Sequence, residues 1–423
     1  MAFSIDFSPP LTADVWIAYS GGLDSTVLLH RLVQLRREQH FSLKAIHIHH
    51  GLNTQADAWQ MHCQNTCQEW QVQCITHKIN LSQETGNIEA RARTLRYAHF
   101  SSLLKENDIL CTAHHQDDQA ETFLLQLVRG AGPKGLSAMP AKVDLGQGKL
   151  QRPILQIQRD ELLDYAIQHG LSWVDDESNQ ETRFSRNFIR HKILPILKQR
   201  WPSVTETMAR SSQHCAESEA LLNEYGSQLT TSCVNQDGRL RVSRLKSLTV
   251  IQQKLVLRYW LTEQHCCLPS DAQLRNALHI FLKAADDKNP MMRWENIEMR
   301  RYRDELYIMH QAHFHDAQQV LSWKNLSEPL VISSLGLTLS VTKKLGDGIN
   351  AAFSESWEIR FRQQNPALKK RFQYWGIPAW ERSRIPLLYI ENELAAVLGY
   401  QINKKFRPKK NEEGLYIRAS RTD

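Results

Sequence analysis

Residues 15–25 read VWIAYSGGLDS, and this stretch determines the fold of the first part of the chain. The apolar run 15–19 has the length and composition of a buried strand. It ends in the loop 20–25, whose two glycines let the backbone turn tightly and approach a ligand without an intervening Cβ. Residues 24–39 then show the periodicity of an amphipathic helix. The pattern predicts a strand, a tight loop and a helix in succession.

Strand-like and helix-like segments alternate along the first half of the chain. The predicted strands are 15–19, 44–49, 72–79 and 109–113, and the predicted helices are 24–39, 56–70, 87–105 and 116–128. Repeated strand–helix units predict a parallel sheet with helices on both faces. We therefore assign this half to the α/β class, as a doubly wound parallel sheet, and expect ligands at the carboxyl ends of the strands.

The rest of the chain is predicted to form a mainly helical middle domain and a small α+β C-terminal domain. The segments are a Gly/Pro-containing loop at 130–149, helices at 159–169 and 185–200, the second broken near Pro195, and one long helix at 205–229. Helices follow within 245–285, strands within 293–309, and strands with one short helix from 354 onward. The expected domains are 1–215, 216–315 and 316–423.

The loop 20–25 is suited to phosphate binding. Ser20 and Ser25 add hydroxyl donors, and the N-terminus of the following helix presents free N–H groups and a positive dipole end to an anion. Asp24 is placed to hold Mg²⁺ against the phosphates. The loop is not a Walker A motif, because GxxxxGK[ST] is absent. The alternative is a Gly-rich turn with Asp24 as a helix cap, and the strand–loop–helix context favours phosphate binding.

Three histidines, His47, His49 and His50, lie at the end of the second predicted strand. Three imidazoles can indicate a metal site, but alternation along a strand puts His47 and His49 on one face and His50 on the other. We therefore interpret this segment as a packed strand end that lines a nucleotide pocket.

A carboxylate-rich segment, residues 112–122 (TAHHQDDQAET), follows the fourth predicted strand. On the predicted helix, Asp117 and Asp118 each lie about one turn before Glu121. Carboxylates in a first turn stabilise the helix dipole, which is the structural interpretation. They also suit recognition of a cationic amine such as that of lysine, or of Mg²⁺ opposite Asp24. Zinc is disfavoured, because adjacent residues do not easily converge on one metal.

Arginines supply two further candidate sites. In the stretch 86–97, Asn87 is the predicted helix N-cap, and Arg93 and Arg96 share a face that suits a phosphate clamp or pairing with glutamate. Arg186 and Arg190 are one helical turn apart. They are placed to neutralise a phosphate transition state or to bind nucleic-acid phosphates, unless they pair with the acidic run 175–177. The basic loop 129–136 has two interpretations. It is a flexible loop that closes over a ligand such as ATP or RNA, or it is an ordinary Gly-rich connection between two elements.

The amino-acid composition limits the cellular locations and the kinds of partner that are expected for this chain. The chain has 423 residues, 42% hydrophobic and 23% charged, which is typical of a globular protein. We expect a cytoplasmic location without a membrane partner, because neither an apolar run of roughly 18 residues nor a signal-peptide pattern occurs. The eight cysteines include no CxxC pair, which disfavours disulfide, zinc and iron–sulfur frameworks and favours buried reduced thiols. Residues 351–423 hold +6 of the net charge of +7, which suits RNA and equally a solvated surface.

In this order, the motifs resemble the catalytic domain of tRNA(Ile)-lysidine synthetases. SGGLDS resembles the PP-loop of ATP pyrophosphatases, which cleave between the α- and β-phosphates. Residues 47–52 resemble the family's HxxHGL segment, 86–93 its GNxEAxAR stretch and 114–122 its HHxDDxxET motif. The resemblance is close over about 15–200 and looser over 245–309. Residues 358–362 and 368–387 resemble the family's end domain, and the Arg/Gly-rich segment that usually joins them is reduced here to 363–367.

The resemblance implies a ligase that uses ATP and Mg²⁺. The C2 oxygen of the wobble cytidine in tRNA(Ile) with a CAU anticodon attacks the α-phosphate and pyrophosphate leaves. The ε-amine of free L-lysine then displaces AMP, giving lysidine, so that the codon read changes from AUG to AUA and charging from Met to Ile. A carboxylate must bind and deprotonate the amine, and among Asp117, Asp118 and Glu121 the last two are preferred. No DNA partner is implied, and the oligomeric state stays open, a homodimer included.

The resemblance also assigns roles to individual residues. The catalytic residues are Asp24, Asp118, Glu121 and Arg190. ATP is expected to contact Ser20, Gly21, Gly22, Leu23, Asp24, Ser25 and His49. The expected Mg²⁺ ligand is Asp24.

Three other functions are compatible with parts of the sequence. Another PP-loop tRNA-modifying enzyme, such as a cytidine thiolase, typically needs paired cysteines, and no CxxC occurs. Small-molecule PP-loop ligases lack the combination of HxxHGL, HHxDDxxET and a basic end domain. A tRNA-binding protein without catalysis is disfavoured by the intact SGGLDS loop and the acidic helix.

Overall fold

The structure, a computed structural model, describes residues 5, 7, 9, 13–49, 51, 55–79, 88–176, 181–285, 288–310, 315–354, 356–361 and 366–421. The chain forms two compact units, Met1–Glu224 and Tyr225–Asp423, and the division falls within one long helix, α9 (Val204–Cys233). Within the described ranges, no helix is both long enough and apolar enough to cross a membrane.

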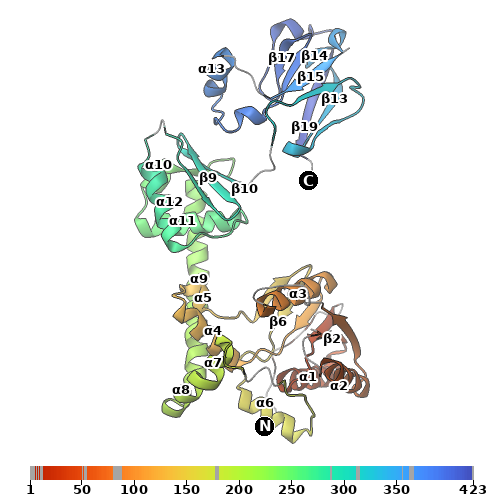
Figure 1. The fold of residues 1–423 in the computed structure, drawn as a ribbon, viewed down its shortest axis with the longest axis vertical. Helices are drawn as coiled ribbons and strands as arrows, with labels where there is room; N and C mark the ends of the chain where they lie inside the picture. Colours follow the sequence, from red (N-terminus) through yellow and green to blue (C-terminus); the bar gives the residue numbers. More distant parts are fainter. Residues whose placement is uncertain are drawn as a thin grey trace. The chain divides into compact units, whose positions relative to one another are not determined.

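A six-stranded sheet forms the centre of the first unit (Figure 1). Its strands are β1 (Asp14–Ala18), β2 (Ser42–His49), β3 (Gln73–Lys78), β4 (Ile109–Cys111), β5 (Lys142–Leu145) and β6 (Gly148–Gln151). Their order is β3-β2-β1-β4-β6-β5, and all neighbours are parallel except the edge strand β5. The helices are α1 (Leu23–Gln39), α2 (Ala56–Glu69), α3 (Ile88–Leu103), α4 (Gln116–Val128) and α6 (Arg159–Gln168). The predicted doubly wound parallel sheet is confirmed.

Both faces of the sheet are buried. On one face, Ile17 of β1 packs in a cluster with residues of α1, α2 and α6, Leu162 among them. On the other face, Trp16 and Ile46 pack in a second cluster with Phe100 of α3. Burial on both faces explains why these strands are almost continuously apolar.

The direction of the connections reverses at β1. This strand pairs with β2 on one side and with β4 on the other, so the loops that follow β1 and β4 open at the same edge of the sheet. Ligands of open α/β sheets bind in the crevice at such a switch point. The two loops are the SGGLDS segment and the start of α4, which brings the two strongest sequence motifs together.

Two predicted segments differ in detail. The loop predicted at 130–149 contains the short helix α5 (Pro133–Leu136) and the hairpin β5–β6. Glycine at 146 is required by the hairpin turn: its φ is +60°, and a Cβ there would lie 2.3 Å from the carbonyl oxygen of Ser101. The break predicted near Pro195 is a π-helical turn at Ile189–Ile193, between α7 (Ser185–Phe188) and α8 (Leu194–Arg200). Proline lacks the N–H that a regular helix needs there.

The second unit begins with a helical part. Its helices α10 (Val242–Lys246), α11 (Val250–Glu263) and α12 (Asp271–Lys283) accompany an antiparallel sheet of order β7-β10-β9-β8. The strands are β7 (Leu240–Arg241), β8 (Met291–Trp294), β9 (Ile297–Tyr302) and β10 (Glu305–His310). Trp260 of α11, Phe281 of α12 and Met299 of β9 share one buried core. The predicted helical middle is confirmed.

The C-terminal part contains two antiparallel sheets around a core that includes Trp323, Leu339 and Trp357. One sheet comprises β11 (Val320–Trp323), β15 (Trp357–Arg360), β16 (Leu387–Ile390), β17 (Glu393–Val397) and β18 (Gln401–Ile402). The other comprises β12 (Leu330–Ile332), β13 (Leu337–Leu345), β19 (Glu413–Arg421) and β14 (Ile349–Asn350). The one short helix predicted after residue 354 is α13 (Pro366–Tyr374), whereas strands β11–β14 are additional to the sequence prediction.

The eight cysteines are free thiols. Five of them are buried, as the sequence predicted, but Cys267 is exposed. Several residues of the predicted motifs lie outside the described part of the chain, namely His50, Leu52, Asn53, Gly86, Asn87, residues 177–179 and residues 362–365.

Candidate active site

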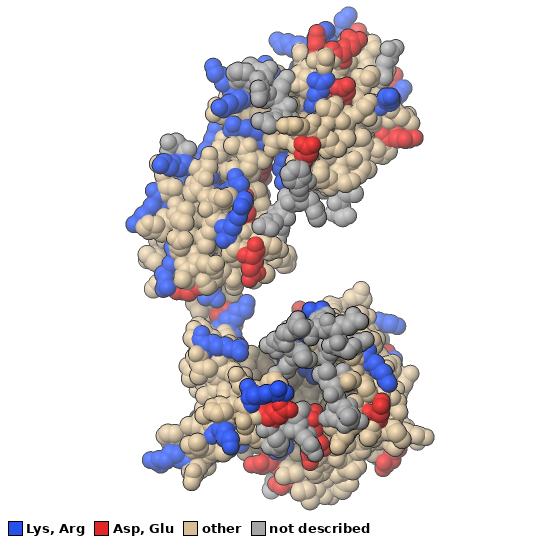
Figure 2. All heavy atoms as spheres, viewed as in Figure 1, with Lys and Arg blue, Asp and Glu red and all other residues tan. Residues whose placement is uncertain are grey.

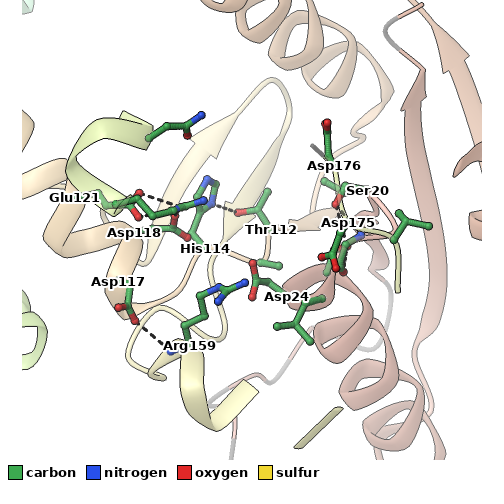
Figure 3. Close-up of a pocket in the computed structure, with 18 of the residues that line it drawn as sticks. Ser20, Asp24, Thr112, His114, Asp117, Asp118, Glu121, Arg159, Asp175 and Asp176 are labelled. Carbon is green, nitrogen blue, oxygen red and sulfur yellow. Dashed lines mark hydrogen bonds and ion pairs between the residues drawn. The ribbon is translucent and has the colours of Figure 1, made fainter. Parts of the chain in front are cut away.

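The loop between β1 and α1 forms one wall of a pocket in the first unit (Figure 3). The Ser20 hydroxyl lies 3.0 Å from the Ser25 hydroxyl and accepts a hydrogen bond from the Gly22 N–H at 3.4 Å. The Ser25 hydroxyl also donates to the Gly22 carbonyl at 3.0 Å. These bonds fix the loop so that the N-terminus of α1 faces the pocket, as anion binding requires.

Gly21 is the position in this loop where a side chain is least tolerated. Its φ is +85°, and a Cβ there would lie 2.9 Å from the sulfur of Cys63 and 3.1 Å from a methyl group of Val174. The Val174 N–H donates to the Gly21 carbonyl at 2.9 Å, so the segment around Val174 packs directly against the loop. Both the backbone conformation and the space therefore require glycine.

We expect Gly21→Ala to lower the melting temperature and to raise the KM for ATP at least about tenfold, because a left-handed alanine costs about 1–2 kcal/mol before the contacts are counted. Gly22→Ala is the matched control for stability. Gly22 has a φ of −76°, and a Cβ there would meet its nearest atom at 3.6 Å. Equal melting temperatures for the two variants would contradict this account, and thermal unfolding with ATP titration measures both effects.

The histidines at the end of β2 are packed residues of the pocket wall. His47 is buried and donates from Nδ1 to the Tyr19 carbonyl at 3.0 Å, and burial lowers its pKa. His49 also lines the pocket, and its Nε2 lies 3.1 Å from Asp57. Among the described residues, no group of three His, Cys, Asp or Glu side chains is arranged to hold a metal ion.

Four charged side chains from two elements form a compact ion-pair cluster. Arg186 donates to Glu121 at 2.7 Å and to Asp118 at 3.0 Å. Arg190 donates to Glu121 at 2.6 Å and to Asp118 at 3.0 Å. Both arginines therefore pair with carboxylates of α4. Two carboxylates and two guanidinium groups balance each other in charge.

Burial and charge act in opposite directions on this cluster. Burial alone would raise the pKa of Asp118, but the charges of His115 and Arg186 outweigh it and hold the pKa of Asp118 well below its usual range. Burial alone would lower the pKa of Arg186, and the neighbouring carboxylates raise it instead. Asp118 and Arg186 are therefore both ionised at neutral pH.

His115 connects this cluster with the phosphate-binding loop. The side chain is almost completely buried, and its Nε2 lies 3.4 Å from Asp118 and 3.6 Å from Asp24. Burial would lower its pKa, but the surrounding carboxylates raise it, so they favour the positively charged form of the ring. The other oxygen of Asp24, Oδ1, is buried without a hydrogen-bond partner in the described structure.

Asp117 has different partners from Asp118. Its Oδ1 accepts from the Lys198 ammonium at 2.5 Å, and its Oδ2 accepts from the backbone N–H of Arg159 at 3.1 Å. Burial raises its pKa, but the bond from Lys198 prevails and the pKa is lowered. His114 lies nearby, and its Nδ1 is 2.9 Å from the Thr112 hydroxyl. Burial lowers the pKa of His114 to about 3. His114 is therefore neutral in the pocket.

Apart from Gly21, the residues predicted to bind ATP or to act in catalysis line one pocket, together with residues that the sequence did not indicate. Leu23 and all four predicted catalytic residues line the same pocket as the phosphate-binding loop. Arg93 and Arg96 of α3 also line it. The residues that sequence reasoning missed include Trp59, Arg159, Asp160, Val174, Phe184 and Lys198. Arg159 directly follows the loop after β6, so recognition of that parallel strand would have pointed to it.

Family models and curated relatives match most of this chain. Family models match residues 6–197 (PP-loop domain), 240–307 (TilS substrate binding domain) and 350–419 (TilS substrate C-terminal domain). The tRNA(Ile)-lysidine synthase of Coxiella burnetii is 43% identical over 95% of this chain and 92% of its own length. That of Pectobacterium atrosepticum is 38% identical over 95% and 94%. The solved U34-tRNA thiolase NcsA of Methanococcus maripaludis is 19% identical, with a TM-score of 0.43 over 49% of this chain and 74% of its own.

Proposed function

The chain belongs to the tRNA(Ile)-lysidine synthase family of PP-loop ligases that modify tRNA, and we propose that it joins free L-lysine to C2 of the wobble cytidine of tRNA(Ile). The observation that supports this most strongly is the meeting of two motifs in one pocket. His115 lies within 3.6 Å of both Asp24, in the phosphate-binding loop, and Asp118, in the acidic helix. A nucleotide and an amine are therefore accommodated side by side. The three-domain division of the chain at 215 and 315 is retained as part of the proposal.

ATP is proposed to bind with its phosphates on the loop from Ser20 to Ser25 and with His49 in contact with the nucleotide. The unpartnered buried oxygen of Asp24 suits a divalent cation, because Mg²⁺ takes one or two carboxylate ligands along with phosphate oxygens. Bound there, Mg²⁺ would neutralise charge on the phosphates. The loop itself contains no Lys or Arg, so the remaining positive charge must come from other elements.

In the first step, the C2 oxygen of cytidine attacks the α-phosphorus while the bond to the pyrophosphate breaks. Arg190 lines the pocket and is held by two carboxylates, with its Nε on Glu121 at 2.6 Å and its Nη2 on Asp118 at 3.0 Å. A guanidinium fixed in this way stabilises developing phosphate charge without reorganising. We therefore propose that Asp118 and Glu121 act chiefly by positioning Arg190.

In the second step, the lysine amine attacks C2 and AMP leaves with the former C2 oxygen. The amine must lose a proton to attack, so it needs a carboxylate with free acceptor capacity. Asp118 and Glu121 were the preferred candidates from sequence, but both already accept from two arginines. Asp117 accepts one ammonium, that of the half-exposed Lys198. We therefore propose Asp117 as the contact for the substrate amine, which would exchange with Lys198.

Asp117→Asn is expected to raise the KM for lysine at least about tenfold, because a charge-assisted hydrogen bond contributes about 1.5–3 kcal/mol. The rate of tRNA-dependent pyrophosphate release at saturating ATP should change little. Lys198→Met is the paired variant: it removes the competing ammonium and should leave the KM for lysine unchanged or lower it. An unchanged KM in Asp117→Asn, measured by steady-state lysine titration, would assign the amine to another carboxylate.

The second unit is proposed to hold the tRNA. Figure 2 shows Lys and Arg side chains over both its helical and its C-terminal parts on the visible face. In the C-terminal part, the exposed cations include Lys369, Lys370, Arg371, Lys404, Lys405 and Arg407. Basic side chains on a surface neutralise RNA phosphates.

The activation step can be tested by itself. Purified protein with ATP, Mg²⁺ and an unmodified tRNA(Ile) transcript should release pyrophosphate only when the tRNA has a cytidine at the wobble position. Release that is independent of this base would count against cytidine as the nucleophile. The cytidine-thiolase alternative is not favoured, because the curated relatives compared here are all named tRNA(Ile)-lysidine synthase.

A further inference from the structure

The cations that line the pocket differ in whether a carboxylate neutralises them. Arg183 pairs with Glu181 at 2.5 Å, Lys198 pairs with Asp117 at 2.5 Å, and Arg190 pairs with the α4 carboxylates. Arg159 also lines the pocket, yet in the described part of the chain no carboxylate lies within ion-pairing distance of its guanidinium. An arginine that lines a pocket without a counter-ion is available for an anionic ligand.

The main chain of Arg159 is fixed, whereas its side chain is open to the pocket. It is the first residue of α6, and its backbone N–H donates to Asp117 at 3.1 Å. The preceding residue, Gln158, donates its N–H to Glu161 at 3.2 Å in a capping box that sets the start of the helix. Figure 3 shows the Arg159 side chain extending from α6 between Asp117 and Asp24, with the guanidinium toward Asp24.

This position corresponds to the reacting centre of the proposed reaction. Asp24 belongs to the loop that would hold the ATP phosphates, and Asp117 is the proposed contact for the lysine amine. The α-phosphorus must lie between these two groups, because the base is first bonded to it and then attacked by the amine. The phosphate-binding loop supplies no cation of its own, and the charges of Arg186 and Arg190 are balanced by Asp118 and Glu121.

We propose that Arg159 is a catalytic residue that donates hydrogen bonds from its guanidinium to the non-bridging oxygens of the ATP α-phosphate. This proposal rests on the proposed function. As the C2 oxygen forms its bond to the α-phosphorus, the bond between that phosphorus and the pyrophosphate oxygen breaks. Negative charge increases on the oxygens near Arg159 and on the leaving group, and a planar guanidinium can contact two such oxygens at once.

The test compares Arg159→Ala, Arg159→Lys and Arg37→Ala. Arg37 is an exposed arginine of α1 that does not line the pocket, so it controls for loss of a surface charge. Arg159→Ala should reduce the rate of tRNA-dependent pyrophosphate release about 100-fold at saturating ATP, as removal of one transition-state donor does. The KM for lysine should be unchanged. Arg159→Lys should recover part of the rate, because the ammonium keeps the positive charge but lacks the planar pair of donors of a guanidinium. Guanidinium ion added to Arg159→Ala should also restore part of the rate of pyrophosphate release.

Arg159→Ala keeps the backbone N–H that bonds to Asp117, so it should fold, and its melting temperature checks this. If it does not fold, Arg159→Gln takes its place. Pyrophosphate release at the wild-type rate with a raised KM for lysine would overturn the proposal and assign Arg159 to the carboxylate of lysine. Wild-type behaviour in both measurements would also overturn it. Failure of the proposed function is distinguishable, because the wild-type protein would then release no pyrophosphate with this tRNA.

Discussion

Asp118→Asn is expected to abolish AMP release in the presence of ATP, tRNA and lysine, and to destabilise the first unit by about 3 kcal/mol. The carboxylate accepts from Arg186 and Arg190 through one oxygen, each at 3.0 Å, and from the backbone N–H of His115 through the other, also at 3.0 Å. An amide of the same shape has no charge, and its NH₂ group would face a donor on one side or the other. Two guanidinium groups would then share Glu121 alone.

The loss of stability should be near the lower end of the range for a broken buried pair. The side chain of Asp118 is 11% exposed, whereas those of Arg186 and Arg190 are 29% and 30% exposed and are partly solvated. The effect on the rate of AMP release should exceed the effect on stability, because Arg190 would lose the bond to Asp118 that helps to fix its orientation.

Chemical denaturation and AMP release should be measured on Asp118→Asn, Arg190→Gln and the double variant. The double variant should lose less free energy of unfolding than the two single variants lose in total, because it removes both members of one ion pair. Asp144→Asn, an exposed residue of the edge strand β5, is the control and should match the wild-type protein. Full activity in Asp118→Asn would contradict the proposed role of the cluster.

Asp24→Asn is the second variant with a large expected effect. It should reduce tRNA-dependent pyrophosphate release at least about 100-fold, because a metal ion at the phosphates contributes several kcal/mol to the transition state. Unlike Asp118, Asp24 has one oxygen without a partner in the described structure, so its replacement removes few contacts. The melting temperature should therefore change little, while the Mg²⁺ concentration needed for half-maximal activity should rise.

The contrast between the two variants is informative. Asp118→Asn should lose both stability and activity, and Asp24→Asn should lose activity with stability largely retained. Asp164→Asn, an exposed residue of α6 outside the pocket, is the control for charge. An Asp24→Asn protein with an unchanged Mg²⁺ requirement would assign the metal to other ligands.

Much of the site could be predicted because its residues lie at strand ends. Residues 15–25 identify a strand, a loop and a helix by local pattern alone, and the rule that parallel strands end at one edge then places Asp24 near Asp117 and Asp118. The second strand end is predicted in the same way, which is why His49 was included. These inferences require only the periodicity of the hydrophobic residues, the residue types in the turns and the rules for connecting successive strands and helices.

The rest depends on contacts between segments that are distant in sequence. Arg186 bonds to residues 65 and 68 positions earlier, while the acidic run 175–177 is the nearer partner in sequence, so local reasoning could not choose between them. Arg159 was missed because strand β6 begins in a segment whose glycines led to the prediction of a loop. One of these glycines, Gly146, forms the tight turn that joins β5 to β6. The choice of Asp117 over Asp118 likewise depends on counting acceptors that are already occupied.

The most direct test of the central claim is incorporation of radiolabelled lysine into an unmodified tRNA(Ile) transcript with a CAU anticodon, with and without ATP. The account predicts labelling that requires ATP and disappears when the wobble cytidine is replaced by uridine. Pyrophosphate release that depends on the tRNA, with no label incorporated, would contradict it, because the base would then be activated for a nucleophile other than lysine.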